Sequence, residues 1–186
     1  MLTRLSNWIQ QKSSGWMMIG SLVIMSLFTI LVLPAQAKIS LENTGSSKTP
    51  DTSLLYTPAE IYQMAENYGP DGRQAYIYAR WTFDLVFPLV YVGFLISGIS
   101  WFFKQLPASK KIWPFANLFP FTAGLFDYLE NSATSLVMYL YPAQWTGIAL
   151  LAAIFTGLKW VFILLSFTGY LFFGIAAFVR WLKRKQ

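Results

Sequence analysis

The chain has 186 residues, of which 55% are hydrophobic, 18% are aromatic and only 12% are charged. Soluble domains have about 25% charged residues, so this composition indicates a polytopic membrane protein. The net charge of +6 does not indicate a nucleic-acid partner, because the basic residues form short clusters beside apolar runs. The chain has no Cys and no His, which excludes disulfides, thiolate catalysis, the usual zinc sites and His-ligated haem. We therefore expect no cofactor and no metal.

Four apolar runs reach the ~20 residues that a helix needs to cross a bilayer. They predict an all-α integral membrane protein, a four-helix transmembrane bundle in a single domain. The spans are expected at about residues 16–36, 76–104, 112–141 and 146–181. The segment 37–75 is then a partly helical extracytoplasmic loop.

The distribution of charges predicts the orientation. The segments before the first span, between the second and third, and after the fourth contain basic residues and no acidic one. These basic residues are Arg4, Lys12, Lys104, Lys110, Lys111, Arg180, Lys183, Arg184 and Lys185. The loop between the first and second spans mixes both signs. By the positive-inside rule both termini are cytoplasmic, and we expect the protein in the cytoplasmic membrane.

The first apolar run has two interpretations. Basic residues precede it and Ala35-Gln36-Ala37 follows it, which is typical of a signal peptide cleaved after Ala37. The run is longer than the ~7 to 15 residues of a usual signal core, which favours a retained span. Cleavage would leave three spans and would not change the orientation of the rest.

The long loop divides into two parts. Lys38 to Leu55 is rich in small polar residues and is predicted to be a flexible linker. Thr57 to Glu60 reads Thr-Pro-Ala-Glu, a capping box with proline at the first helical position, so a helix is expected to about Asn67. Gly69 to Gly72 reads Gly-Pro-Asp-Gly and breaks it. From Arg73 a second helix is predicted to continue into the second span.

The third span carries polar residues at membrane depth. Asp127, Glu130, Asn131 and Thr134 share one helical face. An unpaired ionised side chain costs at least ~2.5 to 3.5 kcal/mol there on insertion scales. This face is therefore expected to point toward other helices or a cavity.

Partners for these carboxylates are available on other spans. Arg80 and Asp84 are one helical turn apart and can form an ion pair. Arginine before aspartate is the weaker order for such a pair, so the alternative is that Asp84 interacts with a residue of a neighbouring helix. Lys159 is the sole charge between Gln144 and Arg180. Lys159 either extends to the membrane surface or reaches Asp127 and Glu130.

These residues are the candidate site. Asp127, Glu130 and Asp84 are the acid and base candidates, because paired carboxylates in different environments can exchange protons with a substrate. The candidate ligand-binding residues, which include cations suited to a phosphate or carboxylate head group, are Arg80, Asn131, Thr134, Lys159, Tyr170 and Arg73.

Three functions fit this pattern. The first is a pocket for a lipid or small molecule, or a membrane-embedded enzyme. The second is a non-catalytic subunit or scaffold in which the charges only fix helix packing. The third, a proton or cation path, ranks lowest because residues 112–124 offer few polar side chains. The expected partners are the bilayer, a lipidic or small-molecule ligand, and a second copy packed through Gly93 and Ser97, a small-x-x-x-small pair.

Overall fold

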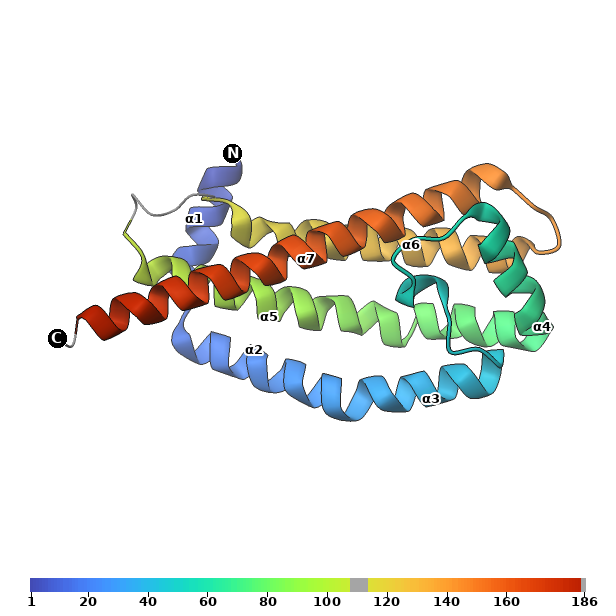
Figure 1. Cartoon of the computed structure of the whole chain (residues 1–186), viewed down its shortest axis with the longest axis horizontal. Coiled ribbons are helices and arrows are strands. Elements are labelled where there is room, and N and C mark those ends of the chain that lie inside the picture. Colours follow the sequence, from blue (N-terminus) through green and yellow to red (C-terminus); the bar gives the residue numbers. More distant parts are fainter. Residues whose placement is uncertain (108–113, 185–186) are drawn as a thin grey trace. The chain divides into compact units, whose positions relative to one another are not determined.

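The computed structural model describes residues 1–107 and 114–184, and these residues form helices, turns and connecting segments with no strand (Figure 1). The α-helices are α1 (Leu2–Lys12), α2 (Gly15–Leu27), α3 (Leu33–Thr44), α4 (Pro58–Arg80), α5 (Phe83–Gln105), α6 (Phe119–Leu140) and α7 (Thr146–Lys183). The shorter helical turns are Phe28–Val32, Pro50–Thr52 and Ala116–Leu118. The all-α class predicted from the sequence is confirmed.

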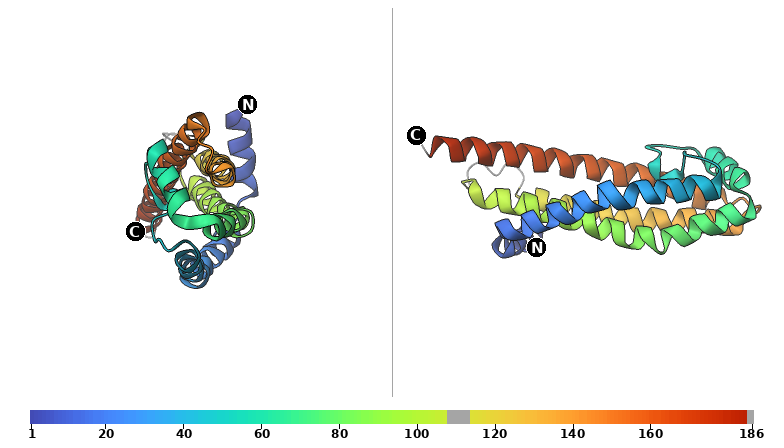
Figure 2. Two further views of the ribbon diagram at one scale, coloured as in Figure 1. Left: turned by 90° about the vertical axis from the view of Figure 1, so that its right-hand side faces the viewer. Right: turned by 90° about the horizontal axis from the view of Figure 1, so that it is seen from below.

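Residue contacts group into two units. The first unit comprises Met1–Ser26, Val90–Ala123 and Val161–Gln186. The second unit comprises Leu27–Leu89 and Gly124–Trp160. Helix α7 is one uninterrupted helix of 38 residues that contributes to both (Figure 2).

Three helical stretches of the described chain are long and apolar enough to cross a membrane: Gly15–Thr44, Pro58–Gln105 and Thr146–Lys183. Helix α6 is not among them, because its polar face lowers its mean hydropathy. Three of the four predicted spans are therefore supported by length and composition. The start of the predicted third span, at residues 112 and 113, lies outside the described residues, as do Lys110, Lys111 and Lys185.

The first apolar helix is longer than predicted. It continues through a π-helical turn, Phe28–Val32, and ends at Thr44, so the expectation of a flexible linker from Lys38 is wrong for its first part. Residues 38–44 contain neither glycine nor proline, and α3 ends only at Gly45, whose φ of 66° lies in the left-handed region. The segment after it contains one 3-10 turn, Pro50–Thr52.

The start of α4 and its internal break agree with the sequence. The Glu60 amide donates to Thr57 Oγ1 at 3.3 Å, and the Thr57 amide donates to Glu60 Oε2 at 2.7 Å. The backbone leaves helical geometry at Gly69, with φ 63° and ψ 177°. The predicted continuation into α5 is interrupted by a short turn, since α4 ends at Arg80 and α5 begins at Phe83. In this turn the Thr82 hydroxyl donates to the Tyr78 carbonyl at 2.7 Å.

The first unit has an aromatic core in which Phe103 and Phe173 meet edge to face at 4.5 Å between ring centroids. The closest approach to α7 is at Gly98, where a Cβ would overlap the Tyr170 ring. The small residue predicted to allow close packing, Gly93, has open space around it. Its partner in that motif, Ser97, lies 2.6 Å from the Ser21 hydroxyl on α2.

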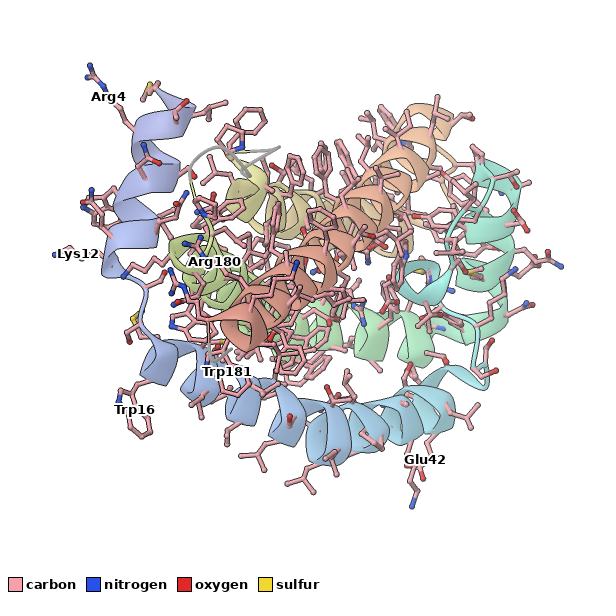
Figure 3. The ribbon with its side chains drawn as sticks, turned by 60° about the vertical axis from the view of Figure 1, so that its left-hand side comes forward. Arg4, Lys12, Trp16, Glu42, Arg180 and Trp181 are labelled. Carbon is pink, nitrogen blue, oxygen red and sulfur yellow. The ribbon has the colours of Figure 1, made fainter. Side chains whose placement is uncertain are left out.

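Helix α1 was not predicted from the sequence. Its buried side carries Ser6, whose hydroxyl donates to Asn117 Oδ1 at 2.7 Å. Asn117 in turn donates to the Ser100 hydroxyl at 3.0 Å. On its other side Arg4 and Lys12 extend away from the ribbon (Figure 3). The helix is therefore held by a buried polar network.

The second unit has a core built from the segment before α4 and from α4, α6 and α7. Its fully buried members include Ile61, Ala65, Val137, Ala149 and Ala152. Helix α3 packs against α4 at Gly72, where a Cβ would lie 2.8 Å from the Asn43 carbonyl oxygen. This close approach needs glycine.

Candidate functional site

Arg80 joins two carboxylates in the second unit. Its Nη1 lies 3.0 Å from Asp51 Oδ2, and its Nη2 lies 2.6 Å from Asp84 Oδ2. The guanidinium also lies over the Tyr76 ring, 4.7 Å from the centroid. Arg80 is only 8% exposed. The predicted pair with Asp84 therefore forms despite the weaker residue order, because burial and a second carboxylate fix the guanidinium.

Lys159 joins the other two carboxylates. Its Nζ lies 2.5 Å from Glu130 Oε2 and 3.8 Å from Asp127 Oδ1. Lys159 is 4% exposed and Glu130 is 0% exposed. The side chain therefore turns inward, and the alternative in which Lys159 extends to the surface is wrong.

The two groups meet at Asp51, because Lys159 Nζ also donates to the Asp51 carbonyl oxygen at 3.4 Å. Together Asp51, Arg80, Asp84, Asp127, Glu130 and Lys159 form what we call the charge cluster. It is assembled from the segment before α4 and from α4, α5, α6 and α7.

Asp51 was not predicted as a site residue, because it lies in a polar segment of the sequence. Burial by itself would raise the pKa of its carboxyl, but the Arg80 guanidinium, then the Lys159 ammonium and the Thr49 hydroxyl, lower that pKa to about 2. The proline of the turn Pro50–Thr52 was the only local signal, since it predicts a fixed backbone next to Asp51.

The polar face predicted on α6 is buried as expected. The Thr134 hydroxyl donates to the Glu130 carbonyl at 2.9 Å, and Thr134 is fully buried. Asn131 is 2% exposed, yet neither its amide nitrogen nor its oxygen has a hydrogen-bond partner among the described atoms. The Ser135 hydroxyl is also buried and unpaired. Unsatisfied buried groups are rare in native proteins and mark places where a ligand or water would bind.

Two predicted site residues lie apart from the charge cluster. Arg73 donates to the Ala65 carbonyl at 2.9 Å and lies 4.8 Å from the centroid of the Tyr141 ring. Tyr170 belongs to the first unit, where its ring lies 4.8 Å from that of Phe94. Arg73 is seven residues before Arg80 and Tyr170 is eleven after Lys159, so helical spacing places each on the same face as a cluster residue. A shared face does not determine how deep a residue lies or which residues it contacts.

The charge cluster is unbalanced. It contains four carboxylates and two cations, so it has an excess of two negative charges if all six groups are ionised. In the part of the chain that the structure describes, no three acidic residues are grouped so as to hold a metal ion. Protonation of carboxyl groups reduces such an excess of negative charge.

A groove of about 500 Å³ lies between α3 and α4 in the second unit. We call it the α3–α4 groove. Most of the residues that line it have polar side chains, among them Gln36, Ser40, Asn43, Gln74, Tyr76 and Arg80, although apolar atoms form the larger part of the lining surface. Arg80 Nε is buried and has no hydrogen-bond partner among the described residues. The groove is therefore lined by one residue of the charge cluster, Arg80, whose Nε–H can donate a further hydrogen bond.

No protein-family model, curated protein or solved structure matches this chain.

Proposed function

We propose that the protein is a four-span membrane protein, with both termini cytoplasmic, that binds the polar head of a lipid or small molecule at the charge cluster. The observation that carries this proposal is that the α3–α4 groove and the charge cluster share Arg80. The volume of about 500 Å³ lies within the ~300 to 1,000 Å³ typical of ligand sites. The ligand enters between α3 and α4 and accepts a hydrogen bond from Arg80 Nε.

The charges decide which head group fits. An anion would meet an excess of carboxylates, so the favoured head group is neutral or zwitterionic and offers a hydroxyl, carbonyl or phosphodiester oxygen to Arg80. The amides of Gln36, Asn43 and Gln74 supply further donors and acceptors. Exposed Ile39 and Tyr78 in the same lining offer an apolar border for a hydrocarbon tail.

The experiment is lipid analysis of protein purified in native-like lipid, followed by native mass spectrometry with defined neutral, zwitterionic and anionic lipids. Ser40→Trp fills the groove, and we expect loss of the bound ligand. Leu41→Trp is the matched control, since Leu41 is exposed on the same helix and does not line the groove. Equal binding by both variants would reject the α3–α4 groove as the site.

A second pair of variants tests the head-group contact. Arg80→Lys keeps the charge but removes Nε and the planar fork, so we expect binding to weaken by about tenfold or more. Arg73→Lys is the control, because Arg73 lies on the same helix outside the groove. Tighter binding of an anionic lipid than of a neutral one, at the site that Ser40→Trp fills, would contradict the preference argued from charge.

The acid and base roles of Asp127, Glu130 and Asp84 remain predictions. Each carboxylate lies beside a cation, but the charge cluster has two more carboxylates than cations, so the arrangement accommodates a proton donor as well as a proton acceptor. Turnover of a bound lipid that Asp127→Asn abolishes, without loss of binding, would establish catalysis.

A packing role is the second candidate, and one contact favours it. Lys159 bonds to the Asp51 carbonyl as well as to Glu130, so the charge cluster fastens the segment before α4 to α6 and α7. If this role is the only one, purified protein contains no stoichiometric ligand. Arg80→Lys then changes thermal stability alone.

A further inference from the structure

A second groove, of about 470 Å³, lies in the first unit between the last turns of α5 and α7. We call it the aromatic–arginine groove, after Trp101, Phe102, Phe178, Trp181, Arg180 and Arg184 in its lining. Figure 3 labels Arg180 and Trp181 near the end of the α7 ribbon. None of these residues belongs to the charge cluster, so the inference below does not rest on the proposed function.

The arginines of this groove have no acidic partner in their own unit. The chain has 8 Asp and Glu residues, and all of them fall within the ranges of the second unit, from Glu42 to Glu130. Neither Arg180 nor Arg184 forms an ion pair with any residue that the structure describes. The groove therefore presents two guanidinium groups that have no carboxylate partner among the described residues.

The rest of the wall is aromatic. Trp101 and Phe102 meet edge to face at 5.4 Å, and Phe178 and Trp181 stack at 5.9 Å between ring centroids. Phe178 is 59% exposed and Trp181 is 49% exposed. A ligand that covers these rings needs a long apolar part, which inorganic phosphate does not have.

Gly174 lets the aromatic wall lie close to α7. A Cβ at this position would lie 3.2 Å from Cε2 of Phe102, so a side chain would press on that ring. The glycine thus allows Phe102 to pack against α7 at the edge of the groove.

The position along the helix identifies the ligand. Arg180 and Arg184 stand at the end of a helix long and apolar enough to cross a membrane. Arginine and tryptophan at such an end match the membrane interface, where acidic head groups and acyl chains occur together. Guanidinium groups bind phosphate oxygens through paired hydrogen bonds.

We propose that the aromatic–arginine groove binds one anionic phospholipid. Its phosphate lies between Arg180 and Arg184. One acyl chain lies over Trp101, Phe102 and Phe178 beside Gly174. The charge of the head group then determines which lipid binds, since the apolar wall does not distinguish between acyl chains.

The test is native mass spectrometry of the full chain in detergent, titrated with phosphatidylglycerol and phosphatidylcholine of the same acyl chains. We expect the wild-type protein to retain one phosphatidylglycerol in preference to phosphatidylcholine. The double variant R180Q/R184Q is expected to bind phosphatidylglycerol on the order of tenfold to thirtyfold more weakly.

Lys183→Gln is the matched control, since Lys183 is a charged residue of the same last turns and does not line the groove. It removes the same charge as one arginine variant, and we expect binding to stay within about twofold of wild type. Equal weakening by Lys183→Gln and Arg184→Gln would show general attraction to an acidic surface and would overturn the site.

A second variant and a second probe test the same site. If the double variant does not fold, Arg184→Gln alone replaces it, because Arg184 is exposed beyond the end of α7. Inorganic phosphate at millimolar concentration is the second probe. Equal retention of both lipids, or displacement of phosphatidylglycerol by phosphate alone, would overturn the proposal.

Discussion

Asp51 touches both halves of the charge cluster, through its carboxylate to Arg80 and its carbonyl to Lys159. Its folded-state pKa of about 2 lies below the ordinary 3.8, so the folded protein binds fewer protons than the unfolded chain in this range. The contribution to stability, about 2 kcal/mol, is complete above pH ~4 and is lost as the pH falls toward 2.

Asp51→Asn tests this linkage. We expect the variant to unfold at lower temperature than the wild type at pH 7. The difference is expected to shrink between about pH 4 and pH 2. Melting temperatures in detergent over this range are the measurement. A difference that stays constant with pH would show that the carboxylate is not the stabilising group.

Glu130→Gln removes the closest partner of Lys159 and leaves Asp127 at 3.8 Å. Breaking a buried pair leaves an incompletely matched charge, so we expect a loss of about 3 kcal/mol in the free energy of unfolding. Denaturant unfolding in mixed micelles measures it. The control is Glu42→Gln, which breaks an exposed pair with Lys38 at 3.9 Å and is expected to change stability by less than about 0.5 kcal/mol.

The sequence predicted the site best where residues repeat on a helix. Asp127, Glu130 and Thr134 are buried on one face of α6 because a 3.6-residue period fixes which side chains point together. Asp51 could not be predicted, because a residue outside a regular helix carries no period. Tyr170 shared a face with Lys159 but belongs to the other unit, since period alone does not give the contact along a long helix.

Within the chain, α5 packs closely on Tyr170 of α7 at Gly98, whereas Gly93, which is predicted to pack against a second copy, has open space around it. Gly98→Ala would force a Cβ into the Tyr170 ring, and we expect a loss of about 1 to 3 kcal/mol. Gly93→Ala, on the same helix with open space around it, is expected to be neutral or stabilising by up to about 1 kcal/mol. Thermal unfolding of the two variants side by side checks this. Equal destabilisation would mean that helix geometry, and not the ring contact, decides the effect.

Element boundaries were predictable where a local signal exists. The capping box at Thr57 and the break at Gly69 both follow from backbone chemistry within four residues. The continuation of α3 to Thr44 was not predicted, because polar composition suggested a linker whereas the helix ends only at Gly45. Helix α1 was missed since its buried contacts, to Asn117 and Ser100, are remote in the chain.

At the scale of the whole molecule the prediction is the four-span topology. The chain has no Cys, so single cysteines can be introduced without background. We expect Ser47→Cys to react with a membrane-impermeant maleimide in intact cells, because the segment after α3 is extracytoplasmic in this topology.

Lys183→Cys is the partner in this experiment, and we expect it to react only after permeabilisation, since the C-terminal basic cluster is cytoplasmic in the same topology. Labelling at both positions in intact cells would contradict an even number of spans. It would leave three crossings, the number of helical stretches supported by length and composition.

The two contacts of Asp51 also have a dynamic consequence. The turn Pro50–Thr52 cannot detach by itself, because opening it would separate Arg80 from one carboxylate and Lys159 from a carbonyl together. The amide hydrogens of Asp51 and Thr52 are therefore expected to exchange with solvent deuterium as slowly as those of a helix interior, although the turn has only three residues. Opening of the turn, which breaks these two contacts, is then the slow step of the exchange. This opening is expected to become faster as the pH falls toward the pKa of Asp51.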